Sequence, residues 1–255
     1  MAIRIASLNS GSNGNCYFIG TKDEAVLVDA GISCRETERR MARLGLEIST
    51  VKAIFISHEH TDHTRGVEVL SKKHRIPVFI TDLTHRHSRL QIDPALKQPL
   101  PAHEHISVGQ LTVKAFPKWH DAAEPLSFVV TGNDVTVGVF TDIGTVCHEL
   151  TRHLSECHAA FLEANYDEGM LDRGRYPLAL KRRIRGAEGH LSNTQALDLF
   201  INHRSHHLKT LILSHLSAEN NHPQLVLDLF KRHANGTRIA VASRYEPSEV
   251  FTIVQ

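Results

Sequence analysis

The sequence predicts an α/β (α+β) fold in which two mixed β-sheets are flanked by helices. Strands lead the chain, and helices are interspersed among the later strands. The β-rich and helical stretches come in two similar rounds, as expected if each round builds one sheet with its own helices. The 255 residues contain no internal repeat, low-complexity segment or linker, and 41% of them are hydrophobic. We therefore expect a single domain over residues 1–255 with a substantial core.

The first round opens as a β meander. Apolar and polar residues alternate over residues 1–8, which is typical of a strand. Ser33 is a predicted N-cap for a helix that ends at Gly45, and Thr61 or Asp62 is a predicted cap for the helix after it. In order, we expect strands over residues 1–8, 16–20, 25–28, 51–57 and 76–80, helices over residues 35–44, 62–74 and 83–90, and a proline-rich loop over residues 93–101.

The strands and helices of the second half of the chain are predicted from the same turn and capping signals. Gly132-Asn133-Asp134 predicts a hairpin turn between two strands, and Ser192 is a predicted N-cap. We expect strands over residues 111–116, 127–131, 135–140, 159–162, 208–214, 237–243 and 250–254, and helices over residues 146–154, 178–184, 193–203 and 223–233.

Composition limits the function classes. A net charge of +1 gives no overall basic bias, so a nucleic-acid partner would have to be met by a local patch. No apolar run reaches the length of a membrane span, and residues 1–6 lack the features of a signal peptide, so we expect no membrane partner. Cys16, Cys34, Cys147 and Cys157 show no CxxC spacing, which favours reduced thiols in the cytoplasm. Nothing in the sequence indicates an oligomeric state.

The densest group of metal-ligand residue types follows the predicted strand at 51–57. His58, His60, Asp62 and His63 lie within six residues. Imidazole and carboxylate suit Zn²⁺ or Mn²⁺, with Fe as a further candidate. The alternative, a solvated histidine-rich turn with Asp62 as a helix cap, is disfavoured because further ligand types follow other apolar strands. These are Asp29, His120, Asp142, Glu163 and His215.

The spacing predicts two ion sites. Residues two apart in an extended segment point the same way, so His58 and His60 can hold one ion, completed by His120. Asp62 and His63 turn toward a second ion, with His215 as a further ligand. Asp142 can bridge both ions. Two ions about 3.5–4 Å apart can activate a water and stabilise a leaving oxygen.

Several neighbouring features have a second reading. Asp29 is predicted to orient a histidine N–H rather than to bind an ion. A lone His120 or His215 is more often a surface residue, and only the complete set favours ligation. The pairs His85/His87 and His103/His105 copy the spacing without the strand context, so we expect them to be exposed.

Two stretches are candidates for substrate binding. The basic run Lys181, Arg182, Arg183 and Arg185 could contact phosphates, or it could be a solvated helix face. The glycine-rich turn that holds Ser12 and Asn15 could present backbone N–H groups to a phosphate, or it could be an ordinary tight turn.

The set His58-x-His60-x-Asp62-His63, His120, Asp142 and His215, in that order, resembles the metallo-β-lactamase fold hydrolases. The resemblance covers most of the chain. It implies a four-layer αβ/βα metallo-β-lactamase sandwich, two divalent metal ions and a metal-dependent hydrolase.

Three further stretches resemble tRNase Z, the tRNA 3′-processing nuclease. They are Leu162-Glu163-Ala164-Asn165-Tyr166, Gly189-His190-Leu191-Ser192 and Leu213-Ser214-His215-Leu216-Ser217. The resemblance implies that Glu163 and His190 protonate the leaving oxygen of a phosphodiester, since a carboxylate beside an imidazole favours its protonated form. The alternative is a structural ion pair at a helix end.

The YycJ/WalJ-type small nucleases of this fold are more similar still. The likeness lies in the turn from Ser10 to Cys16, in the basic run that precedes Gly189 and in Ser214-His215-Leu216-Ser217-Ala218-Glu219-Asn220-Asn221. It implies a DNA exonuclease acting 5′ to 3′. The chain departs from tRNase Z by lacking its tRNA-gripping arm, and from RNase J by lacking its large insertion, which argues against their RNA substrates.

We therefore expect a two-metal phosphodiesterase whose substrate is DNA rather than RNA. Asp62, Glu163 and His190 are its expected catalytic residues, Asp62 orienting or deprotonating the attacking water. One alternative keeps the metals but hydrolyses a thioester or lactone, as glyoxalase II does; another is an RNA-processing nuclease. A metal-dependent binding protein without turnover is the third, against which the complete ligand set argues.

Overall fold

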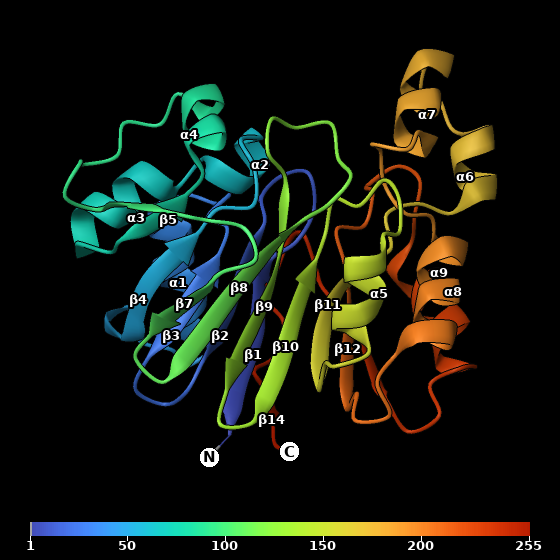
Figure 1. The fold of residues 1–255 in the computed structure, drawn as a ribbon. Helices are drawn as coiled ribbons and strands as arrows, with labels where there is room; N and C mark the ends of the chain where they lie inside the picture. Colours follow the sequence, from blue (N-terminus) through green and yellow to red (C-terminus); the bar gives the residue numbers. More distant parts are fainter. Residues whose placement is uncertain (1) are drawn as a thin grey trace.

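Two seven-stranded sheets pack face to face in the computed structural model, which describes residues 2–255 (Figure 1). The first sheet has the order β14 (Phe251–Ile253), β1 (Ile3–Asn9), β2 (Cys16–Gly20), β3 (Ala25–Val28), β4 (Val51–Phe55), β5 (Val78–Ile80) and β6 (Lys97–Pro99). The second has the order β13 (Arg238–Val241), β12 (Thr210–Ser214), β11 (Ala159–Glu163), β10 (Val135–Phe140), β9 (Leu126–Gly132), β8 (Leu111–Pro117) and β7 (His105–Val108).

Both sheets are mixed. Strands β3 to β6 run parallel to one another, as do β10 to β13, whereas the remaining neighbours are antiparallel. Parallel strands end at a common edge, so residues that follow them are brought together.

The main core lies between the sheets. Phe55 of β4 stacks on Phe79 with ring centroids 4.6 Å apart and meets Phe128 of the other sheet edge-on at 6.0 Å. In β3, Val26 and Val28 face this core, while Leu27 belongs to a separate cluster under the helices. The strands are therefore buried on both faces, which explains their continuous apolar runs.

Helices cover the outer face of each sheet (Figure 1). Beside the first sheet lie α1 (Cys34–Arg43), the 3₁₀ turn η1 (Ile48–Thr50), α2 (Thr61–Thr64), α3 (Val67–His74) and α4 (Asp82–Ser88). With the second sheet lie α5 (His148–Leu154), α6 (Glu168–Arg173), α7 (Leu178–Arg185), α8 (Asn193–His203) and α9 (Pro223–Lys231). The predicted fold class, two mixed sheets flanked by helices, is confirmed.

The local signals with a clear mechanism were predicted well. Ser33 accepts from Glu36 N and caps α1, and Ser192 forms a capping box with Gln195 at α8. Asn133 and Asp134 adopt φ of 51° and 60°, as a two-residue hairpin turn requires.

The predicted helix over residues 62–74 is wrong, because two helices, α2 and α3, replace it. The break falls at Gly66, where a Cβ atom would lie 1.9 Å from the carbonyl oxygen of Ile32. The cap is wrong as well: His60 occupies the N-cap position of α2 without a side-chain hydrogen bond, and Thr61 and Asp62 lie inside the first turn.

Short elements were missed. The predicted loop at 93–101 contains β6, and β7 and α6 were not predicted at all. The strand predicted over residues 51–57 ends at Phe55. Within residues 2–255, none of the helices combines the length and apolar character needed to cross a bilayer.

Candidate metal centre

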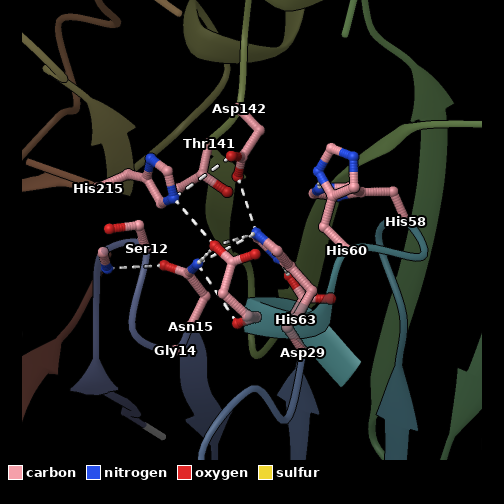
Figure 2. A network of polar contacts seen from close by, with 12 residues as sticks. Ser12, Gly14, Asn15, Asp29, His58, His60, His63, Thr141, Asp142 and His215 are labelled. Carbon is pink, nitrogen blue, oxygen red and sulfur yellow. Dashed lines mark hydrogen bonds and ion pairs between the residues drawn. The ribbon is translucent and has the colours of Figure 1, made fainter. Parts of the chain in front are cut away.

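Side chains from both sheets meet at one end of the sandwich. Asp29 follows β3, His58 follows β4, and Glu163 ends β11. Figure 2 shows His63 beside Asp142, with His58 and His60 on one side of this pair and His215 on the other. The structure thus brings together the sequence-predicted residues Asp29, His58, His60, Asp62, His63, His120, Asp142, Glu163, His190 and His215.

His58, His60 and His120 form the first trio. Each offers a ring nitrogen, and the three nitrogens lie within 4.8 Å of one another. The rings stand nearly perpendicular, with His58 and His60 centroids 4.6 Å apart and His58 and His120 centroids 4.9 Å apart. Three imidazoles facing one point are a typical ligand set for a transition metal.

Asp62, His63 and His215 form the second trio. The Asp62 Oδ2 atom lies 3.5 Å from His63 Nε2 and 3.6 Å from His215 Nε2. The ligand atoms again lie within 4.8 Å of one another. Both trios contain the residues that spacing assigned to them.

Asp142 lies between the trios. Its Oδ2 is 3.3 Å from His63 Nε2, and its Oδ1 is 3.3 Å from His215 Nε2 and 3.9 Å from His120 Nε2. A carboxylate in this position has an oxygen within reach of each trio.

The donor atoms fit divalent cations. The buried atoms His120 Nε2, Asp142 Oδ2 and His215 Nε2 have no hydrogen-bond partner within residues 2–255. Unpartnered buried polar atoms are costly, so a ligand that these atoms coordinate would remove the cost. The fold and these histidine and carboxylate clusters imply divalent metal ions.

The charges of the side chains around the two trios also favour a bound cation. Although burial lowers the pKa of His215, the Asp142 carboxylate and the nearby carboxylates of Asp62 and Glu163 raise it to about 10. At His120 burial has the largest effect and lowers the pKa to about 4. Burial also lowers the pKa of His58. A neutral imidazole is the form that binds metal, and the field of buried carboxylates favours an added cation.

Backbone conformation aims several of these side chains. Asp29, Asp142 and His215 adopt left-handed φ of 61°, 55° and 55°. A left-handed residue directly after a strand redirects the chain, and Asp and His tolerate it better than most residues do. The His215 backbone N–H donates to Ser10 Oγ at 2.7 Å, which fixes this turn.

Residues outside the trios hold the ligands in place. Asp29 is fully buried and accepts from the N–H and Oγ of Ser57, both at 2.8 Å, and from His63 Nδ1 at 2.7 Å. This is the contact predicted for Asp29. Ser57 Oγ also lies 2.9 Å from His58 Nδ1, so one serine links two ligands of different trios.

Glu163 and His190 form a pair beside the second trio. His190 Nδ1 lies 2.7 Å from Glu163 Oε1, and Glu163 Oε2 accepts from Ile143 N at 2.7 Å and from Leu191 N at 3.3 Å. Burial raises the pKa of Glu163, but His190 and hydrogen bonds lower it to about 2. An ionised carboxylate is therefore fixed against His190, whose side chain is 21% exposed.

Asn15, a predicted substrate-binding residue of the glycine-rich turn, is fully buried, and its side chain faces the second trio. Its Nδ2 donates to Asp62 Oδ2 at 3.2 Å and lies 3.1 Å from His63 Nε2 (Figure 2). Ser12 is exposed, as a substrate contact would require, and its Oγ accepts from Arg244 Nη2.

The basic run lies on α7, in which no residue is buried. Arg183 pairs with Asp121 at 2.6 Å, Arg185 pairs with Asp172, and Lys181 donates to the carbonyl oxygen of Asp172. Part of the positive charge is thus neutralised locally. Of the paired histidines outside the centre, His87, His103 and His105 are exposed, and His85 is half-buried and bonds Leu90 O.

Sequence reasoning missed three buried polar residues around the centre. Ser57 is one; Asn165 is the second, donating to His215 O at 2.8 Å and lying 3.2 Å from its Nδ1. Lys118 is the third, donating to Thr141 O at 2.7 Å. Each stands next to or near a predicted ligand in the sequence, which was the available signal.

A trio of histidines and a trio of two histidines and an aspartate, with Asp142 between them, lie at the strand ends of an αβ/βα sandwich. This arrangement defines a metal-dependent hydrolase of the metallo-β-lactamase fold. The chain belongs to the β-lactamase superfamily, because the family model described as "Beta-lactamase superfamily domain" matches residues 24–215. Within it, the chain belongs with the YycJ/WalJ group. It is 33% identical over 228 residues to Exodeoxyribonuclease YycJ of Bacillus anthracis, a match that covers 88% of this chain and 86% of that protein.

Further comparisons indicate the same group of relatives and the same fold. Exodeoxyribonuclease WalJ of Streptococcus pneumoniae is 30% identical over 230 residues, covering 88% of this chain and 86% of that protein. Among solved structures, the metallo-β-lactamase fold protein YhfI from Bacillus subtilis gives a TM-score of 0.75 at 13% identity, covering 99% of this chain and 100% of that one. The short form of human tRNase Z gives 0.65 at 17% identity, covering 96% and 98%. At these identities the structures show the shared fold, and the predicted superfamily is confirmed.

Proposed function

We propose that this enzyme is a DNA exonuclease that removes nucleotides in the 5′ to 3′ direction. The observation that carries the proposal is the Glu163–His190 pair, hydrogen-bonded at 2.7 Å beside the two trios. A phosphodiester needs a proton at its leaving oxygen, and a partly exposed imidazole against a fixed carboxylate can supply one. The names of the YycJ and WalJ relatives support the choice of DNA and of exonuclease action.

The proposal includes two divalent ions, Zn²⁺ or Mn²⁺, with Fe as a further candidate. The trio His58, His60 and His120 would hold one ion, the trio Asp62, His63 and His215 the other, and Asp142 would bind both. When bound, two such ions supply a hydroxide at neutral pH and offset the negative charge of the phosphate.

The residues of the chain carry the remaining steps. Asp62 orients the attacking water or accepts its proton, and Asn15 positions Asp62 through the contact at 3.2 Å. The oxygen of the water bonds to phosphorus, the bond from phosphorus to O3′ breaks, and His190 gives its proton to O3′. Glu163 holds the imidazolium in place.

The substrate path and location complete the proposal. Ser12 and the α7 side chains Lys181, Arg182, Arg183 and Arg185 contact phosphates of the DNA strand. The cytoplasm is the proposed location, consistent with the four free cysteines, a state expected in a reducing compartment.

The test uses end-labelled single- and double-stranded DNA and RNA with Mn²⁺ or Zn²⁺ added. We expect DNA to shorten from its 5′ end, and His60→Ala and Asp142→Ala to abolish cleavage. His87→Ala, which alters an exposed histidine of α4, is the control and keeps full activity. Full activity of the purified His60→Ala and Asp142→Ala proteins would refute the metal assignment, and turnover of a thioester without DNA cleavage would support the thioesterase alternative.

A further inference from the structure

Trp119 is the single tryptophan of the chain, and its side chain is largely in solvent. It is 56% exposed, yet it directly precedes His120, which is 6% exposed and belongs to the first trio. Exposure leaves the face of the indole ring free to contact a ligand next to the first trio.

The backbone around Trp119 is fixed to the segment that leads to His190. Gly144 N donates to Trp119 O at 2.7 Å, and Asp121 N donates to Glu188 O at 3.0 Å. His120 Nδ1 lies 3.2 Å from Gly189 O. Trp119 is therefore held at a set position relative to the Glu163–His190 pair.

Trp119 lines a cavity of about 450 Å³. The other walls are Asp121, Arg183 and the loop over residues 186–189, which ends one residue before His190. Pockets of this size accept small organic groups. The loop contributes Gly186 and Gly189, so its walls carry little side-chain bulk.

We propose that this cavity binds the nucleotide that leaves, and that Trp119 stacks on its base. This inference rests on the proposed function. Because O3′ takes a proton from His190, the nucleotide that carries O3′ must lie on the side of His190, and the cavity lies there. In 5′ to 3′ degradation this is the 5′-terminal nucleotide. Stacking on an indole accepts any base, since every base has a π-face.

A kinetic cycle tests the proposal. The variant Trp119→Ala is compared with wild type on a 5′-phosphorylated DNA strand and on the same strand with an abasic 5′-terminal residue. We expect kcat/KM on ordinary DNA to fall roughly 10-fold or more, as loss of one base–aromatic stack implies. On the abasic strand the two proteins should be equally active, because no base is present to stack.

Two further variants serve as controls for the Trp119→Ala comparison. Trp119→Phe retains an aromatic face and should restore most of the activity. Ile201→Ala removes an exposed apolar side chain of α8 and should leave activity unchanged. Undiminished activity of Trp119→Ala on ordinary DNA, or an equal loss on both strands, would overturn the inference. Failure of wild type to cleave DNA at all would instead refute the proposed function.

Fluorescence gives an independent readout, because all tryptophan emission comes from Trp119. The metal-loaded His190→Ala protein, in which cleavage is slowed, is titrated with each strand, and binding is followed separately by anisotropy of a dye at the 3′ end. At concentrations where both strands are bound, ordinary DNA should change the emission and the abasic strand should leave it nearly unchanged. Equal responses to the two bound strands would contradict stacking.

Discussion

At the scale of single residues, the orientation of His190 follows from its neighbours. Glu163 is held by the N–H groups of Ile143 and Leu191 and engages Nδ1 of the imidazole. The nitrogen left to act on a substrate is therefore Nε2, since the partner of one ring nitrogen defines the role of the other.

The role of His190 as acid is tested with two substrates. We expect His190→Ala to lower kcat on DNA by roughly 10²- to 10⁴-fold, the usual contribution of a general acid. Hydrolysis of bis(p-nitrophenyl) phosphate should fall far less, because its leaving phenolate needs no proton. Steady-state kinetics and metal content are measured for both proteins. Equal losses on the two substrates, or loss of metal, would point to a structural role.

Asp29 contacts His63, so in the proposed two-ion centre it would act on the metals through this ligand. Asp29→Asn places an amide where Ser57 and His63 both donate, so His63 should lose its orientation. Loss of such a partner typically weakens metal affinity about 10- to 100-fold. Competition with a chelator of known affinity measures this effect. Asp23→Asn, at an exposed aspartate, is the matched control, and similar affinities for the two variants would contradict the assignment.

At the scale of elements, the break between α2 and α3 places two ligands. Gly66 N donates to Ala30 O at 2.7 Å, and Ala30 N donates to His63 O at 2.9 Å. The short helix α2 is thereby held against the segment that follows β3. A continuous helix would not maintain these contacts, and Asp62 and His63 would lose their positions.

Gly66→Ala should therefore reduce both stability and metal binding. Its Cβ would meet the carbonyl oxygen of Ile32, and overpacking of this kind costs roughly 1–3 kcal/mol. Gly45→Ala is the comparison, since Gly45 has a φ of 66° but open space around it, so its cost of about 1 kcal/mol is conformational. Urea unfolding measures the stability of each variant, and metal titration measures its metal affinity. Unchanged metal affinity in Gly66→Ala would show that α2 does not depend on the break.

The elements that could be predicted from the sequence are those with strong local signals. Long apolar runs, Ser caps and the Asn-Asp turn identified most strands and helices. The three-residue edge strand β6 lies in a proline-rich segment, and its pairing with β5 depends on residues nearly twenty positions away. The helix break was missed because it results from a contact between Gly66 and Ile32, which no local pattern reveals.

At the scale of the whole molecule, the candidate centre belongs to neither sheet alone. His58 and His63 come from the first sheet and its helix, whereas His120, Asp142 and His215 come from the second. Ions held by residues of both sheets would bind the folded chain and not the unfolded one. The proposed centre therefore couples metal binding to the packing of the two sheets.

Removal of metal should consequently lower the melting temperature. Binding to the native state alone stabilises a protein by about 2.7 kcal/mol when free ion is at 100 times Kd. Scanning calorimetry in EDTA and in excess Zn²⁺ or Mn²⁺ measures the shift. Asp142→Ala, which removes the central carboxylate, should show a much smaller shift. Equal melting temperatures with and without metal would contradict the coupling.

Most of the candidate centre could be predicted from the sequence because each ligand follows an apolar strand. The surrounding residues could not be predicted, because their contacts span the chain. Asn15 reaches Asp62, 47 positions away, and Asn165 reaches His215, 50 positions away. Burial likewise depends on tertiary contacts: Asn15 lies in a glycine-rich turn, yet it is fully buried against Asp62 and His63 of α2.

The left-handed backbone at Asp29, Asp142 and His215 has a consequence for protein engineering. Glycine adopts this conformation at no steric cost, whereas other residues lose roughly 1–2 kcal/mol there. Asp142 and His215 also carry buried atoms without a hydrogen-bond partner within residues 2–255, so a library screened for heat resistance in a chelator would enrich glycine at these two positions and discard the enzyme. Screens for a more heat-resistant variant of this protein should therefore select for catalytic activity, with the metal present throughout.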